Sequence, residues 1–519
     1  MFAFFVFLYY IYFNNSKDLQ KGVVTMKVAD AIVKLLIANG VEVIFGVPGD
    51  TSMTFHHAIE AHHYQIKYIG CRDERHAGYM ADTYARVSGK PGIVDVPSGG
   101  GVLYVAAALS EATASSIPLI CFSSDIARSS QGTGALTELR QEEFLKSVTK
   151  WNTTLTLASK LPHTIKKAFR IATSGRPGAV HLSIPEDIHE QDFDFHPQDL
   201  IASDQKAFKN APNDHDVLQA YELLYQASRP VIIAGGGVHL SQAYQELEEL
   251  AFTYTIPVAT SINGKGSVTE TSAQSVGVIG VNGGMEPTNK VIQEADVVMV
   301  LGSKLNNVTT VAKTLFKQSP KVIQVDVSEE MLDLNIPADV AIMSDIRSFL
   351  RKLNQFMAES KRDFVNELKD WNEWVQKQKA EKQKQIEQEL KEETQYVNAA
   401  RIIEALDKQT DDDALFVIDA GTQNPYMAAH FKLKSAGRKT VFDRGHGNLG
   451  YALSASIGAQ LARPQAKVFS LFGDGSFAMS AGELETASRL HLPIVFIHFQ
   501  NHSYGWIKKL HQLYYDERY

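Results

Sequence analysis

Short apolar segments alternate with helical patterns along most of the chain, and this alternation constrains the fold more than any other feature. Near-continuous apolar runs occupy residues 43–47, 92–96 and 118–123, while residues 29–39 and 75–87 have the apolar spacing of amphipathic helices. Strands that are apolar on both faces and separated by helices are typical of parallel sheets covered on both sides. We therefore expect doubly wound α/β domains.

The same pattern recurs twice, which predicts three such domains in series. Further strand-like runs occupy residues 230–234, 297–301, 321–325, 415–418, 468–472 and 494–499. A chain of 519 residues, at roughly 150 residues per domain, also suggests about three domains. The predicted domains are residues 27–190, 191–358 and 396–519.

A charged, Gln-rich stretch over residues 359–395 joins the second and third domains. Its Lys and Glu spacing supports a solvated helix. A coiled coil is the alternative, but the apolar heptad positions that it requires are missing. We expect a linker helix that crosses the surface, and a helix over residues 481–490 further on.

The first 13 residues are apolar without a break. A membrane-spanning helix needs roughly 20 residues, and a secretory signal would carry a basic leader, whereas the first basic residue is Lys17. A membrane anchor remains the alternative. We expect residues 1–26 to lie outside the fold, with Met26 as the start of the folded chain.

The charge and the cysteines exclude several classes of protein. The net charge is −8, with no basic stripe, which argues against a nucleic-acid binder. Cys71 and Cys121 form no CxxC or Cys/His cluster, so neither a zinc site nor a disulfide scaffold is expected. A reducing, cytoplasmic compartment fits best.

One motif in the third domain has the residue types of a metal site. Gly473-Asp474-Gly475 follows a strand directly, and Asn501 follows the next strand after one helical crossover. Parallel strands end at the same sheet edge, where α/β sheets bind ligands. Asp474, Asn501 and the backbone carbonyl of Ser503 could supply oxygens to Mg²⁺, and the glycines would let backbone amides approach a phosphate. A GDG triplet alone would indicate only a turn.

These residues also carry a family resemblance. Gly473-Asp474-Gly475-Ser476-Phe477 followed by Gln500-Asn501 resembles the thiamine-diphosphate signature, with Gln500 in place of its first Asn. Further matching segments are residues 46–49, 72–77, 84–86, 88–92, 174–178 and 184–187. The chain is identified as a member of the acetolactate synthase, pyruvate oxidase and pyruvate decarboxylase group, over nearly all of residues 27–519.

The resemblance implies the role of each domain and of several residues. The first domain would bind the pyrimidine of thiamine diphosphate, the third would bind its diphosphate with Mg²⁺, and the second would be the central domain. Glu74 matches the catalytic glutamate that hydrogen-bonds the pyrimidine, although an acidic residue at a helix start also favours the helix dipole. Leu449 matches an apolar wedge that bends the cofactor, with a core leucine as the alternative. The implied cofactor-binding residues are Gly49, Thr422, Gly447, Leu449, Gly473, Asp474, Gly475, Ser476 and Asn501, and the implied metal ligands are Asp474, Asn501 and Ser503.

The implied reaction is decarboxylation of a 2-keto acid such as pyruvate, with transfer of the enamine to an acceptor, as in acetolactate synthase. A simple 2-keto acid decarboxylase of the same family is one alternative. Members of the family continue beyond the position of Tyr519, so the third domain is expected to be truncated, and a cofactor-binding but inactive protein is another alternative. Because such enzymes place the cofactor between two subunits, a homodimer or homotetramer is expected.

Several segments depart from the family pattern and leave the substrate open. Leu136-Thr137 replaces a Phe-Gln pair in the first domain. Lys304-Leu305-Asn306-Asn307 replaces the Arg-Phe-Asp-Asp run of flavin-dependent members, which makes FAD doubtful. Gly235-Gly236-Gly237 lacks the third glycine of a dinucleotide fingerprint and is interpreted as a tight turn. His56-His57 is interpreted as a pair of surface histidines.

Overall fold

The computed structural model describes residues 23–200, 209–393, 396–516 and 518, which fall into two compact units. Unit 1 comprises Met1–Ala85 and Lys90–Ala207, and unit 2 comprises Arg86–Gly89 and Phe208–Tyr519. Most of the apolar leader lies outside the described residues, while residues 24–26 belong to a strand. Among the described residues, no helix combines the length and the apolar character needed to cross a membrane.

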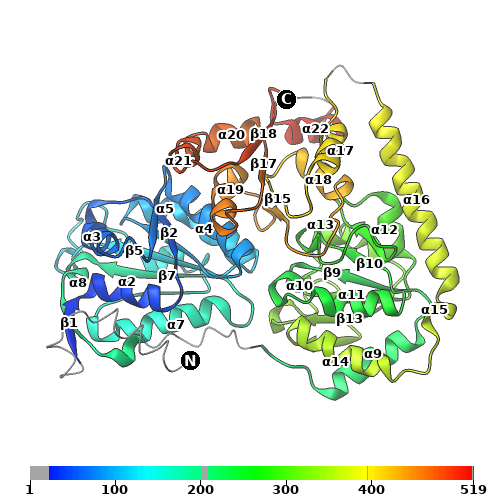
Figure 1. Cartoon of the computed structure of the whole chain (residues 1–519), viewed down its shortest axis with the longest axis horizontal. Helices are drawn as coiled ribbons and strands as arrows, with labels where there is room; N and C mark the ends of the chain where they lie inside the picture. Colours follow the sequence, from blue (N-terminus) through cyan, green and yellow to red (C-terminus); the bar gives the residue numbers. More distant parts are fainter. Residues whose placement is uncertain (1–22, 201–208, 394–395, 517, 519) are drawn as a thin grey trace. The chain divides into compact units, whose positions relative to one another are not determined.

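Unit 1 is built on a six-stranded parallel sheet with helices on both faces (Figure 1). In spatial order its strands are β3 (Lys67–Gly70), β2 (Val43–Gly46), β4 (Gly92–Val96), β5 (Leu119–Asp125), β7 (Ala179–Pro185) and β6 (Trp151–Thr154). One face is covered by α2 (Val28–Ala38), α3 (Met53–Ala61) and α7 (Leu161–Thr173), and the other by α4 (Glu74–Ser88) and α5 (Gly100–Ala114). A separate antiparallel pair, β1 (Val24–Lys27) with β8 (Asp192–Phe195), lies beside α2.

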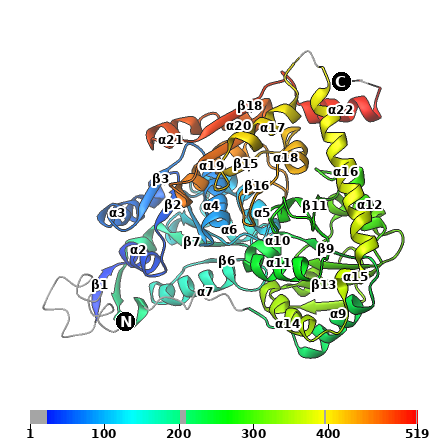
Figure 2. The same cartoon turned by 45° about the vertical axis from the view of Figure 1, so that its right-hand side comes forward.

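Unit 2 contains the other two parallel sheets (Figure 2). The central sheet has the order β11 (Ser275–Val278), β10 (Val258–Thr260), β9 (Pro230–Ala234), β12 (Val297–Leu301), β13 (Lys321–Asp326) and β14 (Val340–Met343). The last sheet has the order β16 (Thr440–Phe442), β15 (Leu415–Ile418), β17 (Val468–Gly473) and β18 (Val495–Phe499). The predicted class, three parallel α/β domains in series, is confirmed.

The predicted linker helix exists, but it does more than cross the surface. It is α16 (Lys369–Lys391), preceded by the short α15 (Phe364–Glu367), and it packs along α12 (Glu286–Gln293; Figure 2). Trp371, Val375 and Ile386 are buried, and the Trp371 indole donates a hydrogen bond to the Pro230 carbonyl at 3.0 Å. These few apolar anchors attach a largely polar helix to the central domain.

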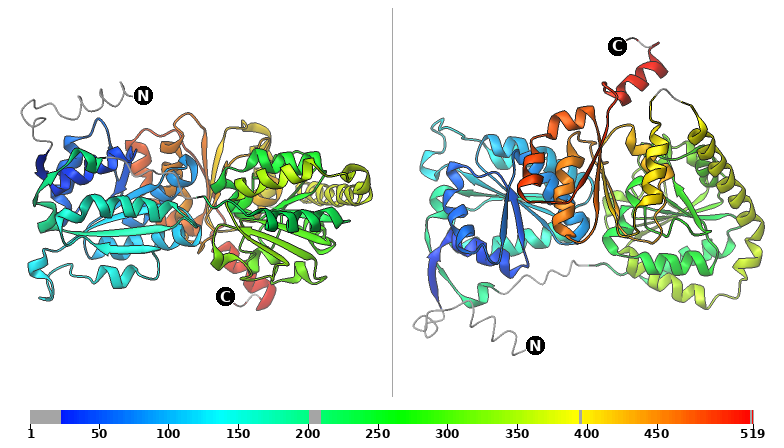
Figure 3. Two further views of the ribbon diagram at one scale, coloured as in Figure 1. Left: turned by 90° about the horizontal axis from the view of Figure 1, so that it is seen from below. Right: turned by 45° about the horizontal axis from the view of Figure 1, so that its top comes forward.

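Two further helices differ from the sequence prediction. The sequence did not predict α20 (Asp474–Ser480), whereas the helix predicted over residues 481–490 is α21 (Glu483–Arg489). The first of them begins directly at the end of β17, so Asp474 is a helical residue. At the chain end, α22 (Gly505–Tyr514) projects from the third domain and has no buried residue (Figure 3).

A buried ion pair joins the central and third domains. The Lys265 ammonium lies 2.7 Å from Glu270 Oε2 and donates to the Phe431 carbonyl, also at 2.7 Å. Glu270 Oε2 in turn accepts the Leu433 amide at 3.0 Å. The two charged side chains are only 2% and 5% exposed, so neither can be solvated if the other is removed.

We expect Lys265→Met to lower the free energy of unfolding of the central domain by about 3–5 kcal/mol, because the buried Glu270 loses the ammonium that pairs with it directly. Shifts in the denaturant-induced unfolding transition measure this loss. The control is Lys290→Met on α12, whose ion pair with Glu286 is exposed and should contribute about 0.5 kcal/mol or less. Equal shifts for both variants would contradict the interpretation, and Lys265→Met combined with Glu270→Met should recover part of the loss.

Candidate active site

The predicted metal-binding residues of the third domain come together at the carboxyl ends of β17 and β18. The strands are parallel, with Gly473 paired to Phe499. The Asn501 amide donates a hydrogen bond to Asp474 Oδ2 at 2.9 Å. Asn501 Oδ1 accepts from the Ser503 amide at 3.1 Å and from its hydroxyl at 3.2 Å. Asp474, Asn501 and Ser503 therefore form one cluster of oxygen-bearing groups.

The surroundings of Asp474 keep its carboxylate ionised. Burial opposes the charge, but hydrogen bonds from the Asn501 and Ser503 amides and the nearby His498 together hold the pKa of Asp474 below its ordinary value. His498 Nε2 lies 2.9 Å from Asp474 Oδ1. The sequence analysis missed His498, although pairing β18 with β17 in register would have placed it beside Phe472, two residues before Asp474.

Glycines allow the loop after β18 to close against this edge. A Cβ at Gly475 would lie 2.6 Å from Tyr504 Cε1, and one at Gly505 would lie 2.3 Å from Asn501 Nδ2. The same added Cβ on Gly505 would lie 3.6 Å from Thr422 Cγ2. Thr422 is therefore close to the side-chain amide of Asn501. Gly473 is less crowded, with its nearest contacts at 3.9 Å.

A buried carboxyl group that the sequence analysis missed links the other predicted cofactor residues. Asp419, at the end of β15, is fully buried and accepts the Ala452 amide at 2.9 Å. Burial raises its pKa to about 7, against opposing hydrogen bonds that include the Ser476 side chain and the Gly450 amide. Through these hydrogen bonds, Asp419 connects the loop that carries Gly447 and Leu449 to the start of α20.

Leu449 lies in a tightly constrained loop but is not a core residue. Gly450 has φ +84°, and a Cβ there would lie 3.1 Å from Met479 Cβ. Gly447 also has a positive φ, of 74°. Leu449 itself is only partly buried. An apolar side chain held by a glycine-flanked loop and open to solvent fits a contact with a ligand better than a place in the core.

In unit 1, Glu74 is the first residue of α4 and lies among the carboxyl ends of the strands. A Cβ on Gly101, at the start of α5, would lie 3.3 Å from Glu74 Oε1 and 2.6 Å from Pro97 Cδ. A Cβ on Gly49 would lie 2.4 Å from the Cβ of the same proline. Pro97 therefore stands between Gly49 and Gly101, with Glu74 beside it. Burial raises the pKa of Glu74 above its ordinary value, partly offset by a backbone hydrogen bond.

Hydroxyl groups that the sequence analysis missed line the same edge of unit 1. Thr51 Oγ1 lies 2.7 Å from Ser124 Oγ and 3.1 Å from Ser98 Oγ. Ser98 Oγ also lies 2.8 Å from Thr137 Oγ1, which brings the segment of Leu136 and Thr137 over the start of α5. Leu136 is 87% exposed, so it contacts little within its own unit.

The interpretation of His56 and His57 as surface histidines holds only for His57. His56 Nε2 lies 3.0 Å from Asp95 Oδ2, whose side chain is 2% exposed, and its ring stacks edge-on against Tyr68. The Tyr68 hydroxyl also donates to Asp95 at 3.2 Å. Helical periodicity turns His56 toward the sheet and His57 toward solvent, a distinction that the dipeptide itself does not reveal.

The donor set of the third domain suits a hard cation. It combines one ionised carboxylate with amide, hydroxyl and backbone oxygens, which Mg²⁺ completes with phosphate oxygens and water. Among the described residues, no three His, Cys, Asp or Glu side chains gather into a metal site, so a transition-metal centre finds no support there. These residues fit a cation bound together with a diphosphate.

Comparisons with known proteins cover all three domains. Family models match three segments: "Thiamine pyrophosphate enzyme, N-terminal TPP binding domain" over residues 26–144, the central domain over 217–353, and the C-terminal TPP binding domain over 419–519. A probable acetolactate synthase large subunit of Methanocaldococcus jannaschii is 31% identical over 502 residues, covering 95% of this chain and 83% of that protein. The acetolactate synthase isozyme 1 large subunit of Escherichia coli is 30% identical, covering 94% of this chain and 84% of that protein.

Proposed function

Because the chain belongs to the thiamine pyrophosphate enzyme family, we propose that it decarboxylates a 2-keto acid such as pyruvate and transfers the remaining two-carbon unit to an acceptor. The acetolactate synthase large subunits among its relatives support this reaction class. Within the chain, the observation that carries the proposal is the contact of Asn501 with Asp474 at the edge of β17 and β18.

The third domain would hold the diphosphate and its cation. Asp474, Asn501 and the Ser503 carbonyl would ligate Mg²⁺, while Gly473, Gly475, Ser476 and Thr422 would face the phosphate oxygens. The depressed pKa of Asp474 favours this role, since a metal ligand must be ionised. Leu449 and Gly447 would contact the organic part of the cofactor and fix its conformation.

The first domain would supply the catalytic acid and base. Thiamine diphosphate, when bound, provides a carbon nucleophile and an electron sink that no side chain offers. Glu74 would hold or pass a proton at the pyrimidine ring, a task suited to a partly buried carboxyl with a raised pKa. Gly49, whose backbone packs closely against Pro97, would contact the cofactor on the same side.

The direct test is to incubate the purified full chain with thiamine diphosphate, Mg²⁺ and pyruvate. We expect release of carbon dioxide and formation of acetolactate. Carbon dioxide with acetaldehyde and no acetolactate would favour the simple decarboxylase of the same family. Cofactor binding without turnover of any 2-keto acid tried would overturn the enzymatic proposal and leave a cofactor-binding protein.

A second copy of the chain would complete the site. Glu74 belongs to unit 1 and Asp474 to unit 2, and α5 presents Leu103 and Tyr104, which are 48% and 61% exposed, close to Gly101 and Glu74. The relatives are named large subunits, which also favours assembly with other chains. We propose a homodimer or homotetramer in which each site joins unit 1 of one copy to unit 2 of another.

Complementation tests this arrangement. Glu74→Gln and Asp474→Asn should each be inactive alone, but a mixed dimer contains one doubly altered site and one unaltered site. Because random pairing makes half of the dimers mixed, co-expression should restore about a quarter of the wild-type activity. Variants produced separately and mixed without exchange are the control. No recovery despite demonstrated mixed dimers would place both residues of a site in one chain.

We propose that the reaction needs no flavin. The glycines after β9 are used for close packing, since a Cβ on Gly235 would lie 2.2 Å from the Gly302 carbonyl. Asn306 serves as the N-cap of α13 (Asn307–Thr310) by accepting the Thr309 amide at 3.0 Å. The segment therefore offers neither an arginine nor a carboxylate to a dinucleotide.

The purified protein is accordingly expected to be colourless and to turn over without added FAD. An absorption spectrum of the concentrated protein, recorded before and after incubation with FAD and desalting, measures this. Addition of FAD should leave the rate unchanged. A yellow protein, or a rate that depends on FAD, would contradict the prediction.

The cysteines favour a reducing compartment. Cys71 and Cys121 are both buried, and Cys121 forms no disulfide among the described residues. Since a buried thiol outside any disulfide is typical of reducing environments, Cys121 supports our proposal that the protein acts in the cytoplasm.

A further inference from the structure

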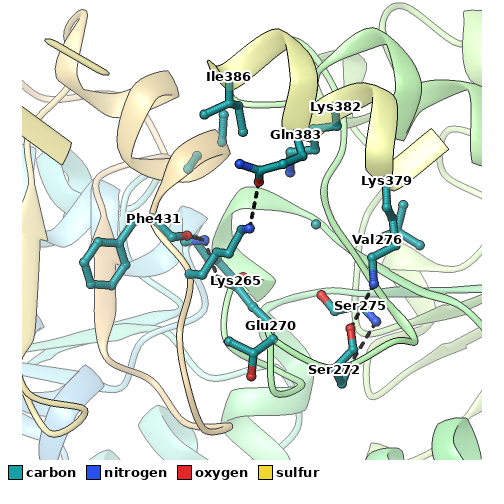
Figure 4. Close-up of a pocket in the computed structure, with 15 residues that line it drawn as sticks. Lys265, Glu270, Ser272, Ser275, Val276, Lys379, Lys382, Gln383, Ile386 and Phe431 are labelled. Atoms are coloured by element: carbon teal, nitrogen blue, oxygen red, sulfur yellow. Dashed lines mark hydrogen bonds and ion pairs between the residues drawn. The ribbon is translucent and has the colours of Figure 1, made fainter. Parts of the chain in front are cut away.

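A small cavity in unit 2 is rich in lysine. Its volume is about 240 Å³, and it lies where the central domain, α16 and the segment after α18 (Gln423–His430) meet (Figure 4). Its charged lining residues are Lys265, Glu270, Lys379, Lys382 and Lys432. None of these residues belongs to the candidate active site, so the cavity calls for an explanation of its own.

Three of the four ammonium groups already have partners. Lys265 is paired with Glu270. Lys379 donates to the carbonyls of Ser272 and Ala273, at 2.9 and 2.7 Å. Lys432, which is exposed, reaches across from the third domain and donates to the Gln383 side chain at 3.0 Å.

Lys382 differs from the other three. Within the described part of the chain its ammonium has no hydrogen bond or ion pair. It lies over Gly277, where an added Cβ would be only 2.6 Å from Nζ. Gly277 has φ +103°, a conformation that favours glycine, so the local backbone leaves room for this ammonium.

The charges in the cavity are unbalanced. Four lysines face one carboxylate, and Glu270 is already engaged by Lys265 and the Leu433 amide. Burial lowers the pKa of Lys382 to about 8, further lowered by Lys265, Lys432 and Lys379 and opposed by Glu270. Burial together with Lys432 lowers the pKa of Lys379 to about 8 as well. A multivalent anion would relieve both the repulsion and the desolvation of these groups.

We propose that this cavity binds a small multivalent oxyanion of the phosphate class, either inorganic phosphate or a small phosphate monoester, with Lys382 as its principal ligand. Lysine binds phosphate as a point charge and needs no fixed geometry, which suits ligands from separate elements. The volume is below that of sites for larger organic ligands, so a compact anion fits best. A bound anion would connect α16 to the central and third domains.

The test uses the full chain and isothermal titration with inorganic phosphate at pH 7, with ionic strength held constant by chloride. We expect saturable binding that Lys382→Met weakens at least about tenfold, because the ammonium that faces the cavity over Gly277 is removed. Lys384→Met is the matched control, because this residue is exposed on the same helix, two positions away, and its loss should leave binding unchanged. Methyl phosphate in parallel distinguishes the two sources, and tighter binding of either supports the proposal while identifying which it is.

Two further measurements guard against misfolding and against a general salt effect. Lys432→Gln alters an exposed residue, so it should fold normally and still weaken phosphate binding. Raising the pH from 7 to 9 should also weaken binding, because Lys382 and Lys379 lose their protons near pH 8. Phosphate becomes more fully dianionic over the same range, so its own titration cannot account for weaker binding. Absence of saturable binding to the wild-type chain, or equal affinities of the Lys382→Met and Lys384→Met variants, would overturn the proposal.

Discussion

Glu74→Gln is expected to lower the turnover of pyruvate by about 10²–10⁴-fold, the range typical of the loss of a general acid or base. The amide has the size of the carboxyl and should keep its place beside Gly101 and Pro97, but it cannot exchange a proton. Cofactor affinity should change only a few-fold. Initial rates at saturating thiamine diphosphate and Mg²⁺, together with cofactor titration by tryptophan fluorescence, separate the two effects.

Two control variants accompany Glu74→Gln: one keeps a carboxyl group at position 74, and the other removes an exposed carboxylate from a different helix. Glu74→Asp retains a carboxyl that is one methylene short, so its rate should lie between those of the wild type and Glu74→Gln. Glu60→Gln removes a carboxylate that is 81% exposed on α3 and should have no effect on rate. If Glu74→Gln were as active as Glu60→Gln, the interpretation of Glu74 as a helix-start residue that favours the helix dipole would replace the catalytic one.

The strands that the sequence predicted best are those buried on both faces. The predicted bounds of β4, β9, β12 and β15 agree with the structure, because each is a nearly continuous apolar run, interrupted in β4 by Asp95. By contrast, β7 was missed. It carries His181 and Ser183, both fully buried, and His181 Nε2 lies 2.7 Å from the Ser123 hydroxyl on β5. Polar residues interrupt the apolar run by which a buried strand is recognised, and the sequence does not show that they pair across strands.

In the candidate site, too, some residues could be predicted from the sequence and others could not. The meeting of Asp474 and Asn501 follows from topology alone, since parallel neighbouring strands end at one edge. His498 and Asp419 depend instead on the register of β18 and on the packing of a loop against α20. The register of the strand and the packing of the loop are both determined by contacts between segments that are distant in the sequence. The sequence therefore locates the sheet edge but not the residues that adjust its electrostatics.

The surroundings of Asp474 define how its function should depend on pH. Its pKa is depressed in the folded chain, so the stability that its contacts contribute is present above the ordinary carboxyl pKa and is lost as the pH falls through the depressed value. Throughout the neutral range the carboxylate is ionised and ready to bind a cation. Protonation of Asp474 is therefore excluded as the cause of any loss of cofactor between pH 6 and pH 8.

Asp474→Asn should weaken Mg²⁺-dependent binding of thiamine diphosphate by at least about 100-fold, because even groups that only support a metal ligand contribute 10–100-fold to affinity. Asparagine keeps an oxygen that can accept the Asn501 amide, so the β17–β18 edge should stay folded. What is lost is the negative charge that attracts the cation between the chain and the diphosphate. Calorimetric titration with thiamine diphosphate, with Mg²⁺ and with EDTA, measures the change.

Glu485→Gln is the matched control, since this residue lies on α21 in the same domain and its carboxylate pairs with Arg489 at 3.1 Å in an exposed position. It should bind the cofactor like the wild type, and both variants should unfold at the wild-type temperature when no ligand is present. If the wild-type chain still binds thiamine diphosphate in EDTA, the cofactor is not held through a cation. Equal affinities of the Asp474→Asn and Glu485→Gln variants would show that the cation is held elsewhere, because a carboxylate that ligates Mg²⁺ cannot lose its charge without cost.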